Sequence, residues 1–194
     1  QSSMVEQVYV APGNAGTAQI ASNLDISPND FAGLVKAAEK HRVEFIVVGP
    51  EAPLADGVVD RFESIGIPIF GPSQAAAEIE SSKVFAKQLM LNHSIPCAGG
   101  AIFTEYDKAK RYLEQGQLPV VIKADGLASG KGVTVANSIT EAMEAIHRIM
   151  KERVFGSAGD RIIIEEYLVG NEMSSFAFTD GKSVVRAISA CDYK

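Results

Sequence analysis

The stretch "KADGLASGKGV" at residues 123–133 decides how this chain is interpreted, because it combines glycines and lysines in one short loop. Glycine allows backbone N–H groups to approach a ligand, and lysine attracts negative charge, so together they indicate a phosphate-binding loop. A Walker A loop has four residues between its glycines and a Ser or Thr after its lysine. Here three residues separate Gly126 from Gly130, and Gly132 follows Lys131. The loop therefore belongs to a different phosphate-binding architecture.

The segments on either side of this loop are both predicted strands, Val120–Lys123 and Val133–Ala136, because they are rich in β-branched residues. A loop between two strands can fold over phosphates as a lid, whereas a loop that enters a helix holds them on the helix dipole. We expect the lid type, with Lys123 directed at phosphate oxygens and Lys83 adding a second charge from the preceding helix. The local sequence around Lys83 fits a solvent-exposed surface lysine as well as it fits a phosphate-binding one.

A second cluster of candidate residues is "IEEYLVGNE" at residues 164–172, where a predicted strand ends in acidic residues. Glu165, Glu166 and Leu168 offer a carboxylate and backbone groups to the amino group and ring nitrogen of an adenine. Glu172 follows one short loop later and is placed to accept hydrogen bonds from ribose hydroxyls. The alternative interpretation is a charged strand end that is exposed to solvent and binds nothing. The lysines and glycines upstream favour the interpretation as a nucleotide-binding site.

The first part of the chain alternates predicted strands and helices, which favours parallel βαβ units. Its strands are expected at Val5–Val10, Glu44–Val48 and Ile67–Phe70, with helices around residues 31–38 and 58–65. After residues 71–82 the pattern changes to a mixed α+β order, so the domain junction is placed there. The expected fold class is α/β, with a partial Rossmann-like parallel sheet followed by an incomplete α+β domain.

The second part is expected to contain capped helices and further strands. The predicted elements are a helix capped by Ser81 or Ser82 that ends near Ile95, a strand Ala101–Phe103, a helix capped by Thr104, a helix capped by Ser138 or Thr140, a strand Arg161–Leu168, and a hairpin of Glu172–Thr179 and Ser183–Ala190.

Composition excludes several functional classes. The net charge of -6 over 194 residues offers no basic surface for nucleic acid, and no apolar run reaches the roughly 20 residues that a membrane span needs. Cys97 and Cys191 lack C-x-x-C spacing, so they are interpreted as reduced thiols, either buried or at the surface. His41, His93 and His147 form no metal-ligand pattern and are interpreted as structural. A cytoplasmic protein that acts on small molecules is expected, without nucleic-acid or membrane partners and without a metal site of its own.

Five motifs in this order resemble the ATP-grasp superfamily and, more closely, its phosphoribosylamine–glycine ligase family. They are "VAPGNAGT" at 10–17, "VVGPEAPLADG" at 47–57, "FGPS" at 70–73, "ESSKVFAK" at 80–87 and "VIKADGLASGKGV" at 121–133. The resemblance covers almost the whole chain. A dehydrogenase is not supported, since the chain has no G-x-G-x-x-G run.

The resemblance implies an ATP-dependent carbon–nitrogen ligase of purine biosynthesis that joins glycine to 5-phosphoribosylamine, with Mg²⁺ as a cofactor. It also implies residues 1–80 as a substrate-binding domain without its first strand, and residues 81–194 as an ATP-grasp domain with a lid at about 101–168. The Mg²⁺ ligands are expected beyond Lys194, so the chain is expected to be an inactive fragment by itself, and fusion to other purine-pathway domains is possible in the family. The alternatives are a truncated, non-catalytic nucleotide-binding homologue and another ATP-grasp carboxylate–amine ligase.

The family's functional residues map onto this sequence by motif. For the nucleotide, phosphate contacts are expected from Lys83 and Lys123, adenine contacts from Glu165, Glu166 and Leu168, and the ribose contact from Glu172. The tip of the lid is expected to consist of Gly126, Ser129, Gly130, Lys131 and Gly132. Substrate contacts are expected from Gly13, Asn14 and Glu51, and catalytic roles from Lys123, Asp192 and Lys194. Tight-turn chemistry explains Gly13, Asn14 and Glu51 equally well. Tyr193 stands where the family commonly has histidine.

Overall fold

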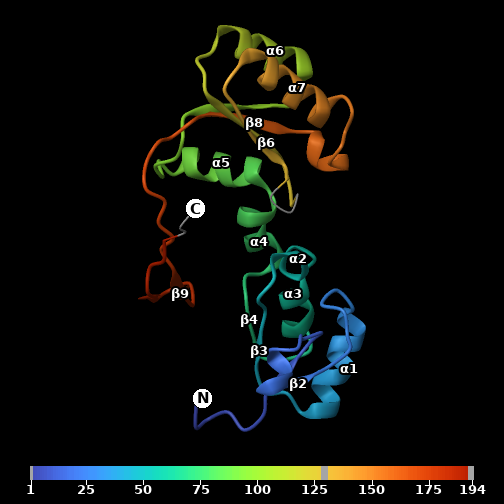
Figure 1. The fold of residues 1–194 in the computed structure, drawn as a ribbon. Helices are drawn as coiled ribbons and strands as arrows, with labels where there is room; N and C mark the ends of the chain where they lie inside the picture. The colour runs from blue at the N-terminus through green and yellow to red at the C-terminus, as the bar shows by residue number, and fades with distance from the viewer. Residues whose placement is uncertain (1, 128–130, 192–194) are drawn as a thin grey trace.

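The computed structural model describes residues 2–127 and 131–191, and the chain forms two units joined by helices (Figure 1). The N-terminal unit contains two separate pairs of short parallel strands. These are β1 (Tyr9–Val10) with β2 (Ser22–Asn23), and β3 (Ile46–Val47) with β4 (Ile69–Phe70). Parallel pairing confirms the partial Rossmann-like character, although each strand is shorter than predicted and β2 was not predicted.

Helices cover the β3–β4 pair and form a small core. They are α1 (Phe31–His41), α2 (Glu51–Ala55) and α3 (Val58–Glu63), preceded by the short 3₁₀ helix η1 (Thr17–Gln19). The side chain of Asp30 accepts a hydrogen bond from the Gly33 N–H and so caps α1. The buried residues of this core are Ala38, Val58, Val59 and Phe62.

Two consecutive helices connect the units. Helix α4 (Gln74–Ser81) is capped by Ser73, and α5 (Lys83–Asn92) is capped by Ser82, whose Oγ accepts from the Phe85 N–H. The cap of α5 was predicted, but α4 was not. The sequence between Gly71 and Ser82 was interpreted only as a boundary, because its apolar residues are mostly alanines and show little periodicity.

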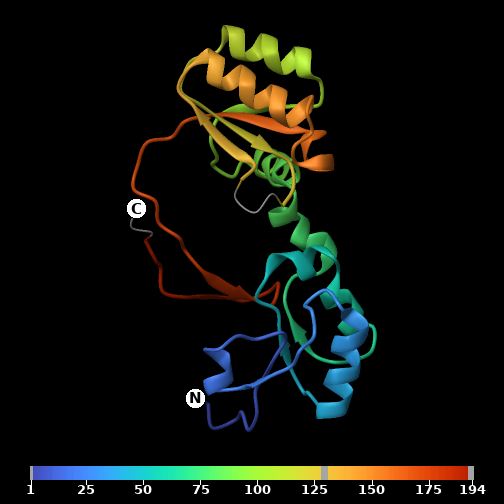
Figure 2. The ribbon, with the colours of Figure 1, turned by 45° about the vertical axis from the view of Figure 1, so that its right-hand side comes forward.

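The second unit is built on a four-stranded antiparallel sheet in the order β5-β8-β6-β7. The strands are β5 (Gly100–Phe103), β6 (Val120–Ala124), β7 (Val133–Ala136) and β8 (Ile162–Glu166). Helices α6 (Tyr106–Gln115) and α7 (Ile139–Met150) lie side by side on one face, and α5 lies on the other (Figures 1 and 2). The 3₁₀ helix η2 (Gly156–Gly159) leads into β8.

Two predicted helix caps in this unit have different outcomes. Ser138 caps α7 by accepting from the Glu141 N–H, as one of the two predicted positions. Thr104 does not cap α6, because that helix begins one residue later, after Glu105, and has no side-chain cap hydrogen bond. The predicted cap at Thr104 is therefore wrong.

Beyond β8 the chain leaves the sheet and runs back toward the N-terminal unit, as both views show (Figures 1 and 2). There β9 (Ala177–Thr179) and β10 (Val184–Arg186) form a short antiparallel hairpin. The rings of Phe178 and Phe70 lie 5.7 Å apart and link this hairpin to β4. The hairpin was predicted, with longer strands. Within the described residues, no helix combines the length and apolar character needed to cross a membrane.

Candidate functional site

The alternation of side chains along β6 gives the sheet an apolar face and a charged face. Val120, Ile122 and Ala124 are buried and belong to the core beneath α6 and α7. Lys123 lies between two of them in sequence, so its side chain projects from the opposite face. On β8, Ile162 and Ile164 share the apolar core while Glu165 turns toward α5. The sheet therefore presents charge on the face where the glycine hairpin begins.

Three charged residues meet on this face. The carboxylate of Glu165 accepts from Lys87 Nζ at Oε1, 2.9 Å away, and from Lys123 Nζ at Oε2, 2.5 Å away. The side chains of Lys87 and Glu165 are 1% and 7% exposed, whereas Lys123 is 33% exposed. Lys123 and Glu165 therefore meet on one face of the sheet, with the buried Lys87 behind them.

The pKa values of the buried pair favour charged groups. Burial alone would raise the pKa of the Glu165 carboxyl, but hydrogen bonds from Lys123 and Lys87 outweigh burial, and the pKa lies below its ordinary value. Burial alone would lower the pKa of Lys87, but its hydrogen bond and attraction to Glu165 hold it above its ordinary value. Both shifts favour the charged forms, so Lys87 and Glu165 form a buried ammonium–carboxylate pair.

The base of the glycine hairpin is tied to the start of α5. The Asp125 carboxylate accepts from Ser82 Oγ at 2.9 Å and from the Val84 N–H at 3.1 Å, and its other oxygen pairs with Arg161 at 2.5 Å. Lys83 Nζ donates to the Gly126 carbonyl oxygen at 2.8 Å. Lys83 is thus a partly buried side chain at the hairpin, and the solvent-exposed interpretation does not describe it.

Gly126 and Gly100 each occupy a position that a larger residue could not share without strain. Gly126 has φ of +108°, a backbone conformation that disfavours residues with a Cβ atom. A Cβ on Gly100 would lie 2.3 Å from the Ile164 carbonyl oxygen and 3.1 Å from Glu165 Cγ. Gly126 therefore allows the chain to turn into the hairpin, and Gly100 allows β5 to approach Glu165 closely.

Part of the same face is apolar and exposed. Val121 pairs with Val135 and Lys123 with Val133, so these side chains share the face that bears Glu165. Val133 and Val135 are 40% and 44% exposed. A flat apolar surface beside ammonium groups can accommodate a heteroaromatic ring joined to an anionic chain. Sequence reasoning treated these valines only as strand formers.

The end of β8 adjoins a cavity of about 490 Å³. Glu165, Glu166 and Tyr167 line it together with Gly99 and the loop at residues 116–119. Glu166 Oε1 accepts from the Gly99 N–H at 2.6 Å, so its carboxylate already has a backbone partner. Leu168, 63% exposed, and the exposed Glu172 follow this strand end, and their adenine and ribose roles stay predictions.

The remaining predicted residues fall into three groups. At the hairpin, the Gly132 carbonyl accepts from the Ala124 N–H, and Lys131 is exposed. In the N-terminal unit, Asn14 Oδ1 accepts from the Gly16 and Thr17 N–H groups, so its side chain holds the turn that follows Gly13. Glu51 is exposed at the start of α2. The predicted positions that lie outside the described residues are Ser129, Gly130, Asp192, Tyr193 and Lys194.

The structure thus brings together Lys83, Lys123, Gly126 and Glu165, but it leaves the N-terminal candidates in the other unit (Figure 1). The residues that sequence reasoning missed are Ser82 as a partner of Asp125, Asp125 itself, Arg161, Lys87 and the three valines. For the valines, the alternation of side chains along the two strands, around Val121 and Val135, was a signal that could have placed them on the face of Lys123. No local sequence signal indicated Lys87, because its partner Glu165 lies 78 positions away in the sequence.

A metal site is not formed by the residues that the structure describes. Among them, no group of three or more His, Cys, Asp or Glu side chains is arranged to hold a metal ion. The nearby carboxylates of Glu165, Glu166 and Asp125 are already bound to lysines, a backbone N–H and Arg161, respectively. These residues therefore do not fit the role of Mg²⁺ ligands.

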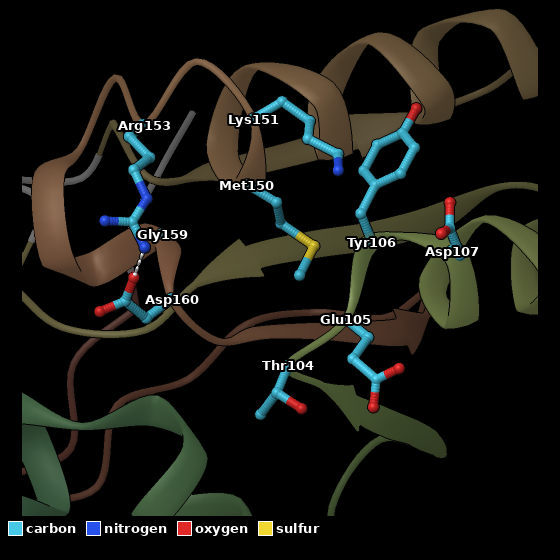
Figure 3. A pocket seen from close by; sticks show the side chains of 9 residues that line it. All are labelled: Thr104, Glu105, Tyr106, Asp107, Met150, Lys151, Arg153, Gly159 and Asp160. Atoms are coloured by element: carbon cyan, nitrogen blue, oxygen red, sulfur yellow. Dashed lines mark hydrogen bonds and ion pairs between the residues drawn. The ribbon is translucent and has the colours of Figure 1, made fainter.

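A second cavity, of about 500 Å³, lies on the side of the sheet covered by helices (Figure 3). It opens between the start of α6 and the end of α7, and it is lined by Thr104, Glu105, Tyr106, Asp107, Met150, Lys151, Arg153, Gly159 and Asp160. Lys151 Nζ lies 4.9 Å from the centre of the Tyr106 ring, and Arg153 pairs with Asp160. Both cations thus contact residues of the cavity itself, and neither Lys123 nor Glu165 lines it.

Comparisons with known proteins agree with this geometry. Residues 1–80 match the family model "Phosphoribosylglycinamide synthetase, N domain", and residues 81–194 match "Phosphoribosylglycinamide synthetase, ATP-grasp (A) domain". Proteins named phosphoribosylamine–glycine ligase from Caldanaerobacter subterraneus and Halalkalibacterium halodurans are each 48% identical over 194 residues. The whole chain aligns in both cases, and it spans 46% and 45% of the relatives' lengths, about half of each.

Solved structures show the same fold. A crystal structure of phosphoribosylamine–glycine ligase from Thermotoga maritima superimposes with a TM-score of 0.74 at 29% identity, and the match covers 93% of this chain and 42% of that one. A biotin carboxylase complex from Campylobacter jejuni gives 0.72 at 20% identity, over 92% of this chain and 43% of that one. The expected α/β class with an ATP-grasp domain is confirmed.

Proposed function

This chain belongs to the phosphoribosylglycinamide synthetase family, and we propose that it takes part in the ATP-dependent joining of glycine to 5-phosphoribosylamine. The products are glycinamide ribonucleotide, ADP and phosphate, in purine biosynthesis. Residues 81–194 bind the nucleotide, with a lid at about 101–168, and residues 1–80 bind the phosphoribosylamine. The proposal goes beyond the family assignment, because the chain spans about half the length of its curated relatives.

The charged face of the sheet supports a nucleotide site. Lys123 has one carboxylate partner and two further N–H donors, and Lys83 has one carbonyl partner and likewise two further donors. Both ammonium groups lie at the base of the glycine hairpin, where they can bind phosphate oxygens. Half-buried Val121 of β6 and the exposed Val133 and Val135 of β7 provide a surface for the adenine ring, and the end of β8 provides backbone groups for its polar edge.

The proposed reaction has two steps. A glycine carboxylate oxygen attacks the γ-phosphorus of ATP, the bond to the bridging oxygen breaks, and ADP leaves with glycyl phosphate formed. The amine of 5-phosphoribosylamine then attacks the glycyl carbonyl carbon, phosphate leaves, and the amine loses a proton. Charge accumulates on phosphoryl oxygens in both steps, so positioned lysines and a closing hairpin lower the barrier electrostatically. No protein nucleophile is required.

ATP-grasp ligases use Mg²⁺ together with ATP, and the ion neutralises phosphate charge when bound. The described residues do not supply its ligand set, as shown above. The roles proposed for this chain are therefore confined to binding, orienting and shielding the nucleotide. Gly13, Asn14 and Glu51 are the candidates for the phosphoribosylamine side.

A cytoplasmic location fits this proposal. The substrates are small phosphorylated metabolites, and Cys97 and Cys191 are both free thiols. The net charge of -6 also fits a protein without a nucleic-acid partner.

The single observation that supports the proposal most strongly is the ion-paired Lys123 at the base of a glycine hairpin, within a chain that both family models match. The test is an assay of the protein produced from its natural reading frame, with ATP, Mg²⁺, glycine and 5-phosphoribosylamine. We expect ADP only when both glycine and 5-phosphoribosylamine are present. ADP formed equally without glycine would exclude this ligase, and ATP binding without turnover would indicate a non-catalytic homologue.

A further inference from the structure

Lys87 is a buried cation whose hydrogen bonds are all used inside the protein. It is 1% exposed, and its ammonium contacts Glu165 Oε1 at 2.9 Å, the Ala98 carbonyl oxygen and Cys97 Sγ at 3.5 Å. An ammonium group has three N–H donors, so these three acceptors account for all of them. Lys87 therefore has no donor left for a ligand and cannot contact a nucleotide directly.

Lys123 is the exposed member of the same cluster. Its Nζ binds the other oxygen of Glu165 at 2.5 Å, and a third of the side chain remains exposed on the open face. Two lysines and one carboxylate carry a net charge of +1. Because Lys87 is buried and fully bonded, the uncompensated charge is presented to a ligand by Lys123 alone.

From this arrangement we propose that Lys87 is a positioning residue of the nucleotide site, which orients and neutralises Glu165 so that Glu165 can hold Lys123 without cancelling its charge. The inference rests on the proposed function, since it takes the ligand of Lys123 to be a nucleotide phosphate. It also gives Glu165 a role that the adenine contact does not include, because both carboxylate oxygens are bound to lysines.

The location of Lys87 explains how it acts over a distance. It joins α5, the loop at residues 97–98 and β8, so it holds the carboxylate from behind while Lys123 holds it from the ligand side. Without Lys87, Glu165 retains Lys123 as its only lysine partner, and the two form a neutral pair. The phosphate would then meet a cluster with no net charge, whereas the apolar surface for the ring would be unchanged.

The test compares ATP and adenosine as probes of the protein produced from its natural reading frame and carrying Lys87→Met, by calorimetric titration or ligand-detected NMR. We expect ATP affinity to fall about tenfold, the scale of one hydrogen bond to a charged group, while adenosine affinity changes less than about twofold. Lys36→Met is the matched control, since Lys36 is an exposed helical lysine in the other unit, and it should change neither affinity. Equal losses for both probes, or no loss of ATP affinity, would overturn the proposal.

A double-mutant cycle keeps the proposal testable if Lys87→Met folds poorly. In a Glu165→Gln background the carboxylate that Lys87 neutralises is absent, so adding Lys87→Met should change ATP affinity less than about twofold. A further tenfold loss would show that Lys87 acts independently of Glu165, which contradicts the proposal. A wild-type protein from the natural reading frame that binds neither ATP nor adenosine would instead show that the proposed function is wrong, which is a distinct result.

Discussion

The two faces of the sheet β5-β8-β6-β7 are made from the same strands but have opposite chemistry. Toward α6 and α7, the side chains of Ile122, Ile162 and Ile164 are all 0% exposed and form a continuous apolar core. Toward α5, the same strands place Lys123 and Glu165 in an ion-paired cluster. One face therefore accounts for stability, and the other has the charges that a phosphate ligand requires. Substitutions on the two faces should separate folding from binding.

The largest effect is expected on the apolar face. Ile164→Ala should lower the free energy of unfolding by about 3 kcal/mol, because it removes a fully buried side chain and leaves a cavity. Chemical denaturation measures this change. ATP affinity well below the unfolding transition should remain within about twofold of wild type. Val135→Ala, at a position 44% exposed, is the control and should cost less than about 1 kcal/mol.

The next effect is expected on the charged face and concerns binding. Lys123→Met should weaken ATP binding by about 2 kcal/mol, or roughly thirtyfold, because it removes charged hydrogen bonds to phosphate. Glu165 keeps Lys87 as a partner, so the free energy of unfolding should change by less than about 1 kcal/mol. Titration calorimetry measures the ATP affinity, and thermal unfolding measures the stability. Unchanged ATP affinity would mean that Lys123 on the charged face does not contribute to ATP binding, which contradicts the separate roles of the two faces.

A smaller effect should separate the true helix cap from the false one. Ser82→Ala should destabilise the protein by about 1 kcal/mol, because Ser82 Oγ caps α5 and also binds Asp125. Thr104→Ala should cost less than about 0.5 kcal/mol, because Thr104 does not cap α6. The difference between the two unfolding midpoints in urea is the measurement. Equal costs for the two substitutions would contradict the assignment of Ser82, and not Thr104, as a helix cap.

The smallest effect is a pH dependence of the charged face. The pKa of Glu165 is lower in the folded chain than in the unfolded chain, so its stabilising contribution is present above the unfolded value of about 4.3. That contribution is lost as pH falls through the lower folded value. The difference in unfolding free energy between wild type and Glu165→Gln should therefore narrow as pH falls from 6 to 3, where roughly all exposed carboxylates also become protonated. A constant difference would contradict the ion-paired state of Glu165.

Several features could be predicted from the sequence because they depend on neighbouring residues. The cap of α5 at Ser82, the cap of α7 at Ser138 and the alternation of β6 follow from local hydrogen bonding and from the two-residue period of a strand. The motif around Gly126 is one of the five sequence motifs that indicated the family. Helix α4 was missed, since a short alanine-rich segment gives little periodic signal.

What only the tertiary structure decided is which distant groups meet. The sequence alone determined a glycine hairpin after a lysine-ended strand and an acidic strand end further along the chain. The insertion of β8 between β5 and β6 sets the register that brings Glu165 to Lys123, and the packing of α5 on β8 adds Lys87 behind it. No local pattern encodes these contacts, because strand order and register depend on burying the apolar residues of the whole sheet at once.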